Sequence, residues 1–206
     1  MNLIDKIFKF NGGINAETKK TISTLLPIER IDIPKKLILP LRQHIGNMPK
    51  IKVNIGDYVL KGQLIAEADG NVSAAIHAPT SGEIKSIEKL PIPHPSGLPD
   101  YCVVIIPDKK DQWIQKFPIN WKKIGVDQTI KLLLNSGIVG LGGAAFPSHL
   151  KLGVNKANKI NTLIVNAAEC EPYITCDDML MREKSEELIK GIQLVQELLG
   201  AKETII

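Results

Sequence analysis

The sequence predicts a two-part fold, a flattened β-barrel followed by the beginning of an α/β domain with a mostly parallel sheet. Between residues 31 and 107, short apolar runs are separated by Gly, Pro, Asn and Asp at intervals of about 8–12 residues, which is typical of a sandwich or barrel. From Asp127 onward the apolar residues follow a helical period. One β-branched and apolar run, residues 160–165, interrupts that period and is typical of a buried parallel strand.

The barrel prediction is most specific over residues 53–87, "VNIGDYVLKGQLIAEADGNVSAAIHAPTSGEIKSI". This segment is similar to the flattened barrels of biotinyl and lipoyl carrier domains, in which Gly56 and Gly62 would make tight turns. Such carriers attach their group to a lysine at a hairpin tip. No lysine occurs from Gln63 to Glu83. We therefore expect the carrier fold without the carrier chemistry.

The chain divides into four predicted parts. We expect an N-terminal arm over residues 1–30, the barrel over 31–110, a linker over 111–126 and an incomplete α/β domain over 127–206. The linker's regularly spaced aromatic residues are expected to pack against the domain that follows. The final "KETII" begins a strand pattern that is not completed, so the sequence is interpreted as the front of a longer protein.

Two helices are predicted in the α/β part. The first extends from Asp127, as its N-terminal cap, to Gly137. The second is one amphipathic helix that begins near Cys176 and ends at Gly200, with Asp177 and Asp178 as its caps.

Composition excludes several classes of protein. The net charge is only +4, the lysine pairs are dispersed and aromatic residues make up 4%, so a nucleic-acid partner is not expected. Three cysteines without a C-x-x-C pair argue against a disulfide framework, and each is expected to be a buried small residue. His77 and His94 are interpreted as structural or surface residues, and no metal site is predicted. No signal peptide is recognised, and no run of about 18 apolar residues could span a bilayer.

A glycine-rich loop follows the first predicted helix. Gly137, Gly140, Gly142 and Gly143 fall within seven positions of "GIVGLGGAAFPSHLKL", residues 137–152. Glycine exposes backbone N–H groups and permits positive φ, so the loop could hold a phosphate or lie against a flat ring. It is not the dinucleotide fingerprint, which follows a strand and opens a helix. From spacing alone, cofactor binding and a structural turn both remain open.

A second, acidic loop, "NAAECEPYITCDD", follows the predicted strand. Asn166 stands at the carboxyl end of that strand, where open α/β sheets bind ligands. Glu169 and Glu171 follow on a turn made rigid by Pro172. Alternate acids there could accept hydrogen bonds from ribose hydroxyls or a ring N–H, or could simply be solvated.

The two loops together resemble the flavin loops of the NADH-oxidising subunit of respiratory complex I. Their pattern there is close to G-R-G-G-A-G-F-P-T-G-x-K-W, then N-x-D-E-x-E-P. The resemblance is closer to the C subunit of the Rnf-type ion-translocating electron-transport complex. That family also has a Gly-Gly-Ile arm, a "PLRQHIG" strand and a "HAPTSG" barrel segment, all present in this chain. The residues that the resemblance places at the cofactor site are Gly140, Gly142, Gly143, Phe146, Lys151, Asn166, Glu169 and Glu171.

The resemblance implies a role for each group. The glycines would let the loop approach flavin mononucleotide (FMN), and Lys151 would face the flavin or its phosphate. Phe146 matches the aromatic residue that stacks on the adenine of NADH, and Glu171 the acid near the nicotinamide nucleotide. Asn166 and Glu169 match flavin contacts.

The resemblance also implies the setting. The chain would be a peripheral subunit on the cytoplasmic face of the bacterial inner membrane, in contact with the membrane only through partner subunits. It would move electrons between NADH and a ferredoxin-like carrier through flavin and [4Fe–4S] clusters, the clusters lying in a C-terminal part beyond these residues. Ala145 and His149 stand where the flavin pattern has glycine. A non-catalytic scaffold with a degenerate flavin site is therefore the alternative.

Overall fold

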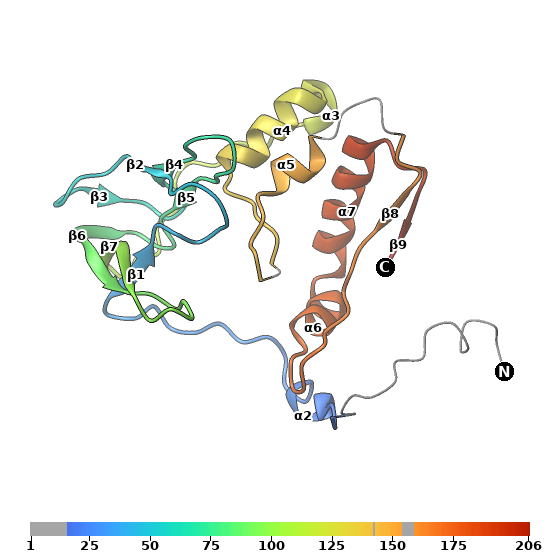
Figure 1. Ribbon diagram of the computed structural model, residues 1–206, viewed down its shortest axis with the longest axis horizontal. Helices are drawn as coiled ribbons and strands as arrows, with labels where there is room; N and C mark the ends of the chain where they lie inside the picture. The colour runs from blue at the N-terminus through green and yellow to red at the C-terminus, as the bar shows by residue number, and fades with distance from the viewer. Residues whose placement is uncertain (1–15, 142, 154–158) are drawn as a thin grey trace.

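Among the residues that the structure describes, seven strands build the N-terminal half of the chain. The computed structural model describes residues 16–141, 143–153 and 159–206 (Figure 1). The strands are β1 (Leu37–Pro40), β2 (Lys50–Ile51), β3 (Tyr58–Val59), β4 (Leu64–Glu67), β5 (Ile76–His77), β6 (Gly82–Pro91) and β7 (Pro99–Pro107). Each falls on or beside one of the apolar runs of the sequence, so the predicted barrel-like architecture is confirmed.

The strands form two antiparallel sheets. One has the order β1-β7-β6-β3 and the other the order β2-β4-β5. Gly56 and Gly62 have φ values of +90° and +81° and make the turns predicted for them. The sheets curl around one apolar core, whose fully enclosed members include Leu41, Val59 and Ile65. This half therefore has its own core, as an independent barrel requires.

The second half is mainly helical. Its elements are α3 (Trp121–Ile124), α4 (Val126–Asn135), α5 (Ser148–Leu152), β8 (Thr162–Ile164), α6 (Cys176–Glu183), α7 (Ser185–Leu199) and β9 (Glu203–Ile205). Strands β8 and β9 pair in parallel with Thr162 opposite Glu203. Two strands are all that the described residues show of a parallel sheet. The β8 strand is less buried than predicted, since Ile164 is 71% exposed.

The structure corrects the predicted helices. The long C-terminal helix is two helices, because Lys184 has a non-helical backbone (φ −129°, ψ 31°) and separates α6 from α7. The Ser185-Glu186-Glu187 sequence that follows is a helix-start signal. Asp127, Asp177 and Asp178 lie inside the first turns of their helices and do not cap them. There they still complement the helix dipole.

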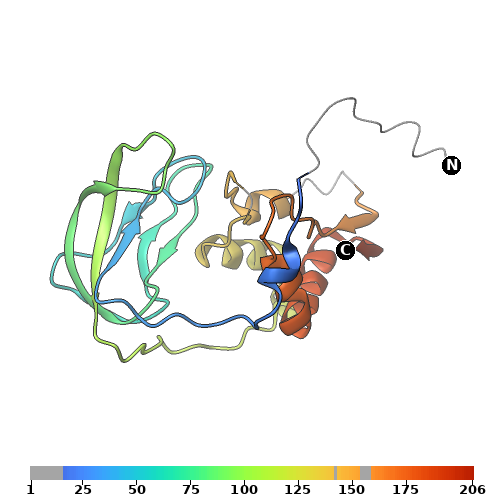
Figure 2. The same ribbon diagram turned by 90° about the horizontal axis from the view of Figure 1, so that it is seen from below.

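Two extended segments join the halves (Figure 2). One leads from α2 (Lys20–Ser23) into β1, and the other leads from β7 to α3. The backbone of Trp113, in the second segment, forms an isolated parallel β-bridge with Lys61 of the barrel. The ring of Trp113 lies against Gly62. The prediction that the linker aromatics pack on the following domain is therefore wrong for Trp113. Phe117 is 70% exposed.

We predict that Ile105→Ala lowers the free energy of unfolding of the barrel by about 2–5 kcal/mol, because this side chain is fully enclosed in the core. The matched control is Ile106→Ala in the same strand, whose side chain is partly exposed. It should cost less than about 1 kcal/mol. Urea unfolding followed by circular dichroism measures both, and equal losses would contradict the assignment of the core face.

Candidate functional site

The glycine-rich segment folds as a hairpin between α4 and α5. The N–H of Ser148 donates to the carbonyl of Ile138 at 3.0 Å, and the N–H of Gly140 donates to the carbonyl of Phe146 at 2.8 Å. Residues 140–146 form its tip, which we call the glycine loop. Gly142 lies outside the described residues. These two hydrogen bonds pair the arms on either side of the glycine loop.

The hairpin lies against the barrel at its base and near its tip. Gly137 follows the end of α4 with φ +67°, and a Cβ atom there would come within 2.1 Å of the carbonyl oxygen of Ala75. Nearer the tip, the N–H of Ile45 donates to the carbonyl of Ala144 at 3.1 Å. Only glycine fits at the base, because both the φ value and the close approach exclude a side chain.

Ala145 of the glycine loop adopts a backbone conformation that is typical of glycine. This alanine has φ +44°, in the left-handed region that glycine adopts at little cost. Chain neighbours aside, no atom of the described residues lies within 4 Å of the place where a Cβ of Gly143 would stand. The loop therefore leaves an open approach to its backbone at Gly143.

A cation stands beside the glycine loop. The ammonium group of Lys151 lies 5.7 Å from the centroid of the Phe146 ring. It lies 3.6 Å from the position that a Cβ of Gly140 would take. Lys151, Phe146 and Gly140, three of the residues predicted from the sequence, therefore lie together.

His149 lies in α5, directly after the hairpin. It is 9% exposed, and its Nδ1 atom has no hydrogen-bond partner among the described residues. Burial lowers the pKa of the imidazole below its usual value, which favours the neutral form. His149 occupies the position at which the flavin pattern has glycine.

The acidic loop is folded around Glu169. The carboxylate of Glu169 accepts the N–H of Asp177 at 2.8 Å and the thiol of Cys176 at 3.2 Å. The Asp177 hydrogen bond lowers the pKa of Glu169, and the bond to Glu169 raises the pKa of the Cys176 thiol. A carboxylate oxygen of Glu169, the sulfur of Cys176 and a carboxylate oxygen of Asp177 lie within 4.8 Å of one another. The hydrogen bonds to Glu169 account for this proximity.

Asn166 and Glu171, the other predicted site residues of the acidic loop, are exposed. Asn166 accepts the N–H of Ala168 with its Oδ1 atom at 3.0 Å. Cys170 and Cys176 are exposed too, so the prediction of buried cysteines is wrong for both and is confirmed for Cys102. Cys170 lies in the acidic loop and Cys176 lies at the start of α6, where their side chains are open to solvent. Cys102 lies on the inner side of β7 and is therefore buried.

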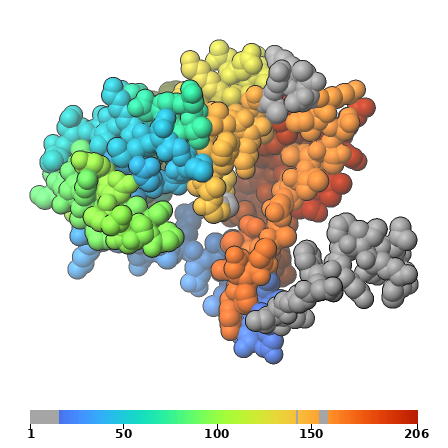
Figure 3. All heavy atoms as spheres, viewed as in Figure 1, coloured from blue at the N-terminus to red at the C-terminus, as the bar shows by residue number. Residues whose placement is uncertain are grey.

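The two loops lie in the same part of the molecule. Figures 1 and 2 place the glycine hairpin between the barrel and the acidic loop, with both extending from the body formed by α5, β8 and α7. Figure 3 shows the orange atoms that follow β8 descending beside the hairpin. The glycine hairpin and the segment that contains the acidic loop are distant in sequence, yet they lie in the same part of the structure.

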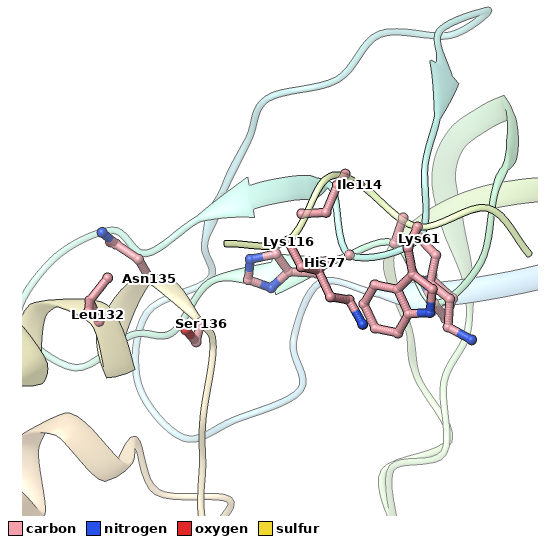
Figure 4. Close-up of a pocket in the computed structure, with 11 residues that line it drawn as sticks. Lys61, His77, Ile114, Lys116, Leu132, Asn135 and Ser136 are labelled. Atoms are coloured by element: carbon pink, nitrogen blue, oxygen red, sulfur yellow. The ribbon is translucent and has the colours of Figure 1, made fainter. Parts of the chain in front are cut away.

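A separate hollow lies between the barrel and α4 (Figure 4). It has a volume of about 560 Å³ and is lined by Lys61, His77, Trp113, Lys116 and Asn135, among others. The ammonium of Lys116 lies 3.1 Å from the centroid of the Trp113 ring, and that of Lys61 is paired with Asp111 at 2.6 Å. None of the predicted site residues that the structure describes lines this hollow.

Comparison with known proteins agrees with the two halves. Residues 8–110 match the RnfC barrel sandwich hybrid domain, and residues 133–206 match the Nuo51 FMN-binding domain. The chain belongs to the RnfC family. Its second half is similar to the FMN-binding domain of Nuo51.

Relatives of this RnfC family member are named as the C subunit of an ion-translocating oxidoreductase complex. The chain is 43% identical to the one from Serratia proteamaculans over 98% of its own length and 29% of the relative's. Identity is 43% to that of Vibrio cholerae and 44% to that of Rhodobacter capsulatus, over 26% and 38% of those relatives. The chain thus spans well under half the length of the relatives it matches. Within its described residues, no helix has the length and apolar character needed to cross a membrane.

Sequence reasoning missed one residue beside the acidic loop. The ammonium of Lys20, in the N-terminal arm, donates to the carbonyl of Glu169 at 2.6 Å. The two residues are 149 positions apart, and a side-chain bond to a backbone carbonyl leaves no pattern in the sequence.

We predict that Ala145→Gly stabilises the protein by up to about 1 kcal/mol. The substitution relieves a left-handed backbone that costs alanine about 1–2 kcal/mol, less the greater freedom of glycine in the unfolded chain. Ala144→Gly is the matched control and should destabilise by about 0.5–1 kcal/mol. Thermal unfolding compares them, and the same sign for both would contradict the φ assignment.

We predict that the free energy of unfolding decreases as the pH falls below about 6.5, the usual pKa of histidine. Burial lowers the folded-state pKa of His77 and of His149, so the unfolded state binds protons first as the pH falls. Urea unfolding between pH 7.5 and 5.5 should show the loss. The double variant His77→Gln/His149→Gln should lose less unfolding free energy over this pH range than the parent protein does. The control variant His94→Gln, at an exposed position, should lose as much as the parent.

Proposed function

We propose that this chain binds FMN between the glycine loop and the acidic loop, as part of a subunit that transfers electrons in a membrane-bound complex. The observation that carries the proposal is the pair of loops on one side of the α/β part, one with a cation and an open backbone, the other with an amide and acids. The match to an FMN-binding domain over residues 133–206 supports it.

The residues present fit a flavin nucleotide. The open approach at Gly143 would admit a flat ring or a phosphate to the backbone, and the nearby Lys151 ammonium supplies the charge that a phosphate requires. Asn166 and Glu171 are exposed and could contact polar edges of the ligand. Flavin, when bound, supplies the hydride and single-electron chemistry, and the protein orients it and adjusts its surroundings.

The finer roles are also part of the proposal. NADH would deliver electrons, with Phe146 against its adenine and Glu171 near its nicotinamide nucleotide. A ferredoxin-like carrier would be the other redox partner, and [4Fe–4S] clusters would be held by a C-terminal part beyond these residues. The name shared by the relatives supports a place among other subunits of an ion-translocating complex. We place the protein on the cytoplasmic face of the inner membrane, in contact with the membrane through its partners.

A scaffold without flavin is the second candidate. The observation in its favour is His149, a buried imidazole at a glycine position of the flavin pattern. Replacing Ala145 and His149 together by glycine separates the two candidates, because a marked gain in FMN affinity would indicate a degenerate site.

We predict that the full-length protein quenches the fluorescence of FMN in a micromolar titration, and that Lys151→Met raises the dissociation constant at least roughly tenfold through loss of a charged phosphate contact. The control is Lys131→Met, which removes an exposed lysine from the neighbouring α4. Folded protein that leaves FMN fluorescence unchanged would contradict the proposed function, and equal effects of the two variants would contradict the role of Lys151.

A further inference from the structure

The N-terminal arm contacts the acidic loop and α6 through residues 18–28, which we call the strap. The carbonyl of Thr18 accepts the N–H of Tyr173 at 2.9 Å, and the carbonyl of Ser23 accepts the hydroxyl of Thr175 at 3.5 Å. Farther along, the N–H of Ile28 donates to both carboxylate oxygens of Glu183 at 2.9 and 3.1 Å. The strap therefore contacts the segment from the acidic loop to the end of α6, and Figure 1 shows α2 and α6 near each other.

Lys20 makes the contact nearest to the candidate cofactor residues. Its half-buried side chain donates to the carbonyl oxygen of Glu169 at 2.6 Å. A hydrogen bond from a charged donor contributes more than a neutral one, and the short distance agrees with a strong bond. Lys20 is thus joined to the backbone of the acidic loop.

Glu169 is held from both sides by these contacts. Its carbonyl accepts the ammonium of Lys20, and its carboxylate accepts the N–H of Asp177 and the thiol of Cys176 in the first turn of α6. A residue fixed at its backbone and at its side chain cannot shift without breaking both sets of bonds. Glu171 and Asn166 lie in the same loop, two and three positions away, so the fixed point at Glu169 limits where they can lie.

We propose that the strap, through Lys20, is a positioning element of the flavin site that holds the acidic loop in the orientation required to bind FMN. The proposal rests on the proposed function for its ligand, and on the contacts above for its geometry. Lys20 acts through the backbone of Glu169 and is not itself a catalytic residue. Because the strap continues into β1, it also joins the acidic loop to the barrel (Figure 2).

The test compares full-length proteins carrying Lys20→Met, Lys20→Arg and Lys19→Met. Lys19 is the matched control, because it is the adjacent lysine and its ammonium lies 3.6 Å from Glu17 at the surface. Two readouts are taken, the dissociation constant of FMN from fluorescence quenching and the amide hydrogen exchange of Tyr173 and Asp177. The second readout needs no flavin.

Lys20→Met is expected to raise the dissociation constant of FMN roughly tenfold and to speed exchange at both amides, since one charged hydrogen bond is lost. Lys20→Arg keeps the positive charge and the N–H donors, so its FMN affinity and its amide exchange should be close to those of the parent protein. Lys19→Met should change neither. Glu183→Ala, which releases the other end of the strap, should shift the FMN dissociation constant and the amide exchange in the same direction but by a smaller amount. This variant replaces Lys20→Met in the test if Lys20→Met does not fold.

The outcomes separate this proposal from the proposed function. If the parent protein binds FMN, a Lys20→Met variant with the same FMN affinity as the parent would overturn the positioning role of the strap. The same conclusion would follow if amide exchange in Lys20→Met equals that in the parent. A parent protein that fails to bind FMN would overturn the proposed function. Faster exchange at Tyr173 and Asp177 in Lys20→Met would in that case still support the strap as the element that holds the loop.

Discussion

The close backbone approach at Gly137 is the constraint on which the rest of the candidate site depends. The carbonyl of Ala75, in the barrel, lies 2.1 Å from the point at which a side chain of residue 137 would begin. The chain leaves α4 there with positive φ and passes directly into the glycine hairpin. Because the hairpin starts against the barrel, the barrel determines which way the glycine loop points. The Ile45–Ala144 hydrogen bond then fixes its outer part.

The acidic loop is oriented from the other side. It begins at Asn166, shortly after β8, folds around Glu169 and enters α6, while the strap holds its backbone through Lys20. The strap itself continues into the first strand of the barrel. Both halves of the candidate flavin site are therefore tied to the same β-domain, one by a glycine contact and one by an extended segment. This gives the barrel, which lacks the lysine of a carrier, a structural role in the site.

Much of the fold could be predicted because its signals are local. The barrel strands coincide with apolar runs bounded by turn residues, and Gly56 and Gly62 adopt the positive φ that their turns require. Errors arose where local patterns compete or where contacts are distant. The helix after Cys176 has a continuous apolar period, yet the start signal at Ser185 divides it. Trp113 packs on the barrel because Gly62 leaves room for its ring, which the spacing of aromatics could not reveal.

The sequence predicted the two loops of the candidate site, but it did not predict the hydrogen bonds that hold the acidic loop. The sequence placed Lys151 and Phe146 near the glycines, but no pattern in it indicated that Glu169 binds the N-terminus of α6 or that Lys20 reaches its carbonyl. Such bonds depend on tertiary distances alone. The most direct test of a flavin site made by both loops is a structure of the full-length protein with FMN. We expect the flavin to contact both the glycine loop near Gly143 and the acidic loop between Asn166 and Glu171. Flavin bound against only one of these loops, or away from both, would contradict the two-loop site.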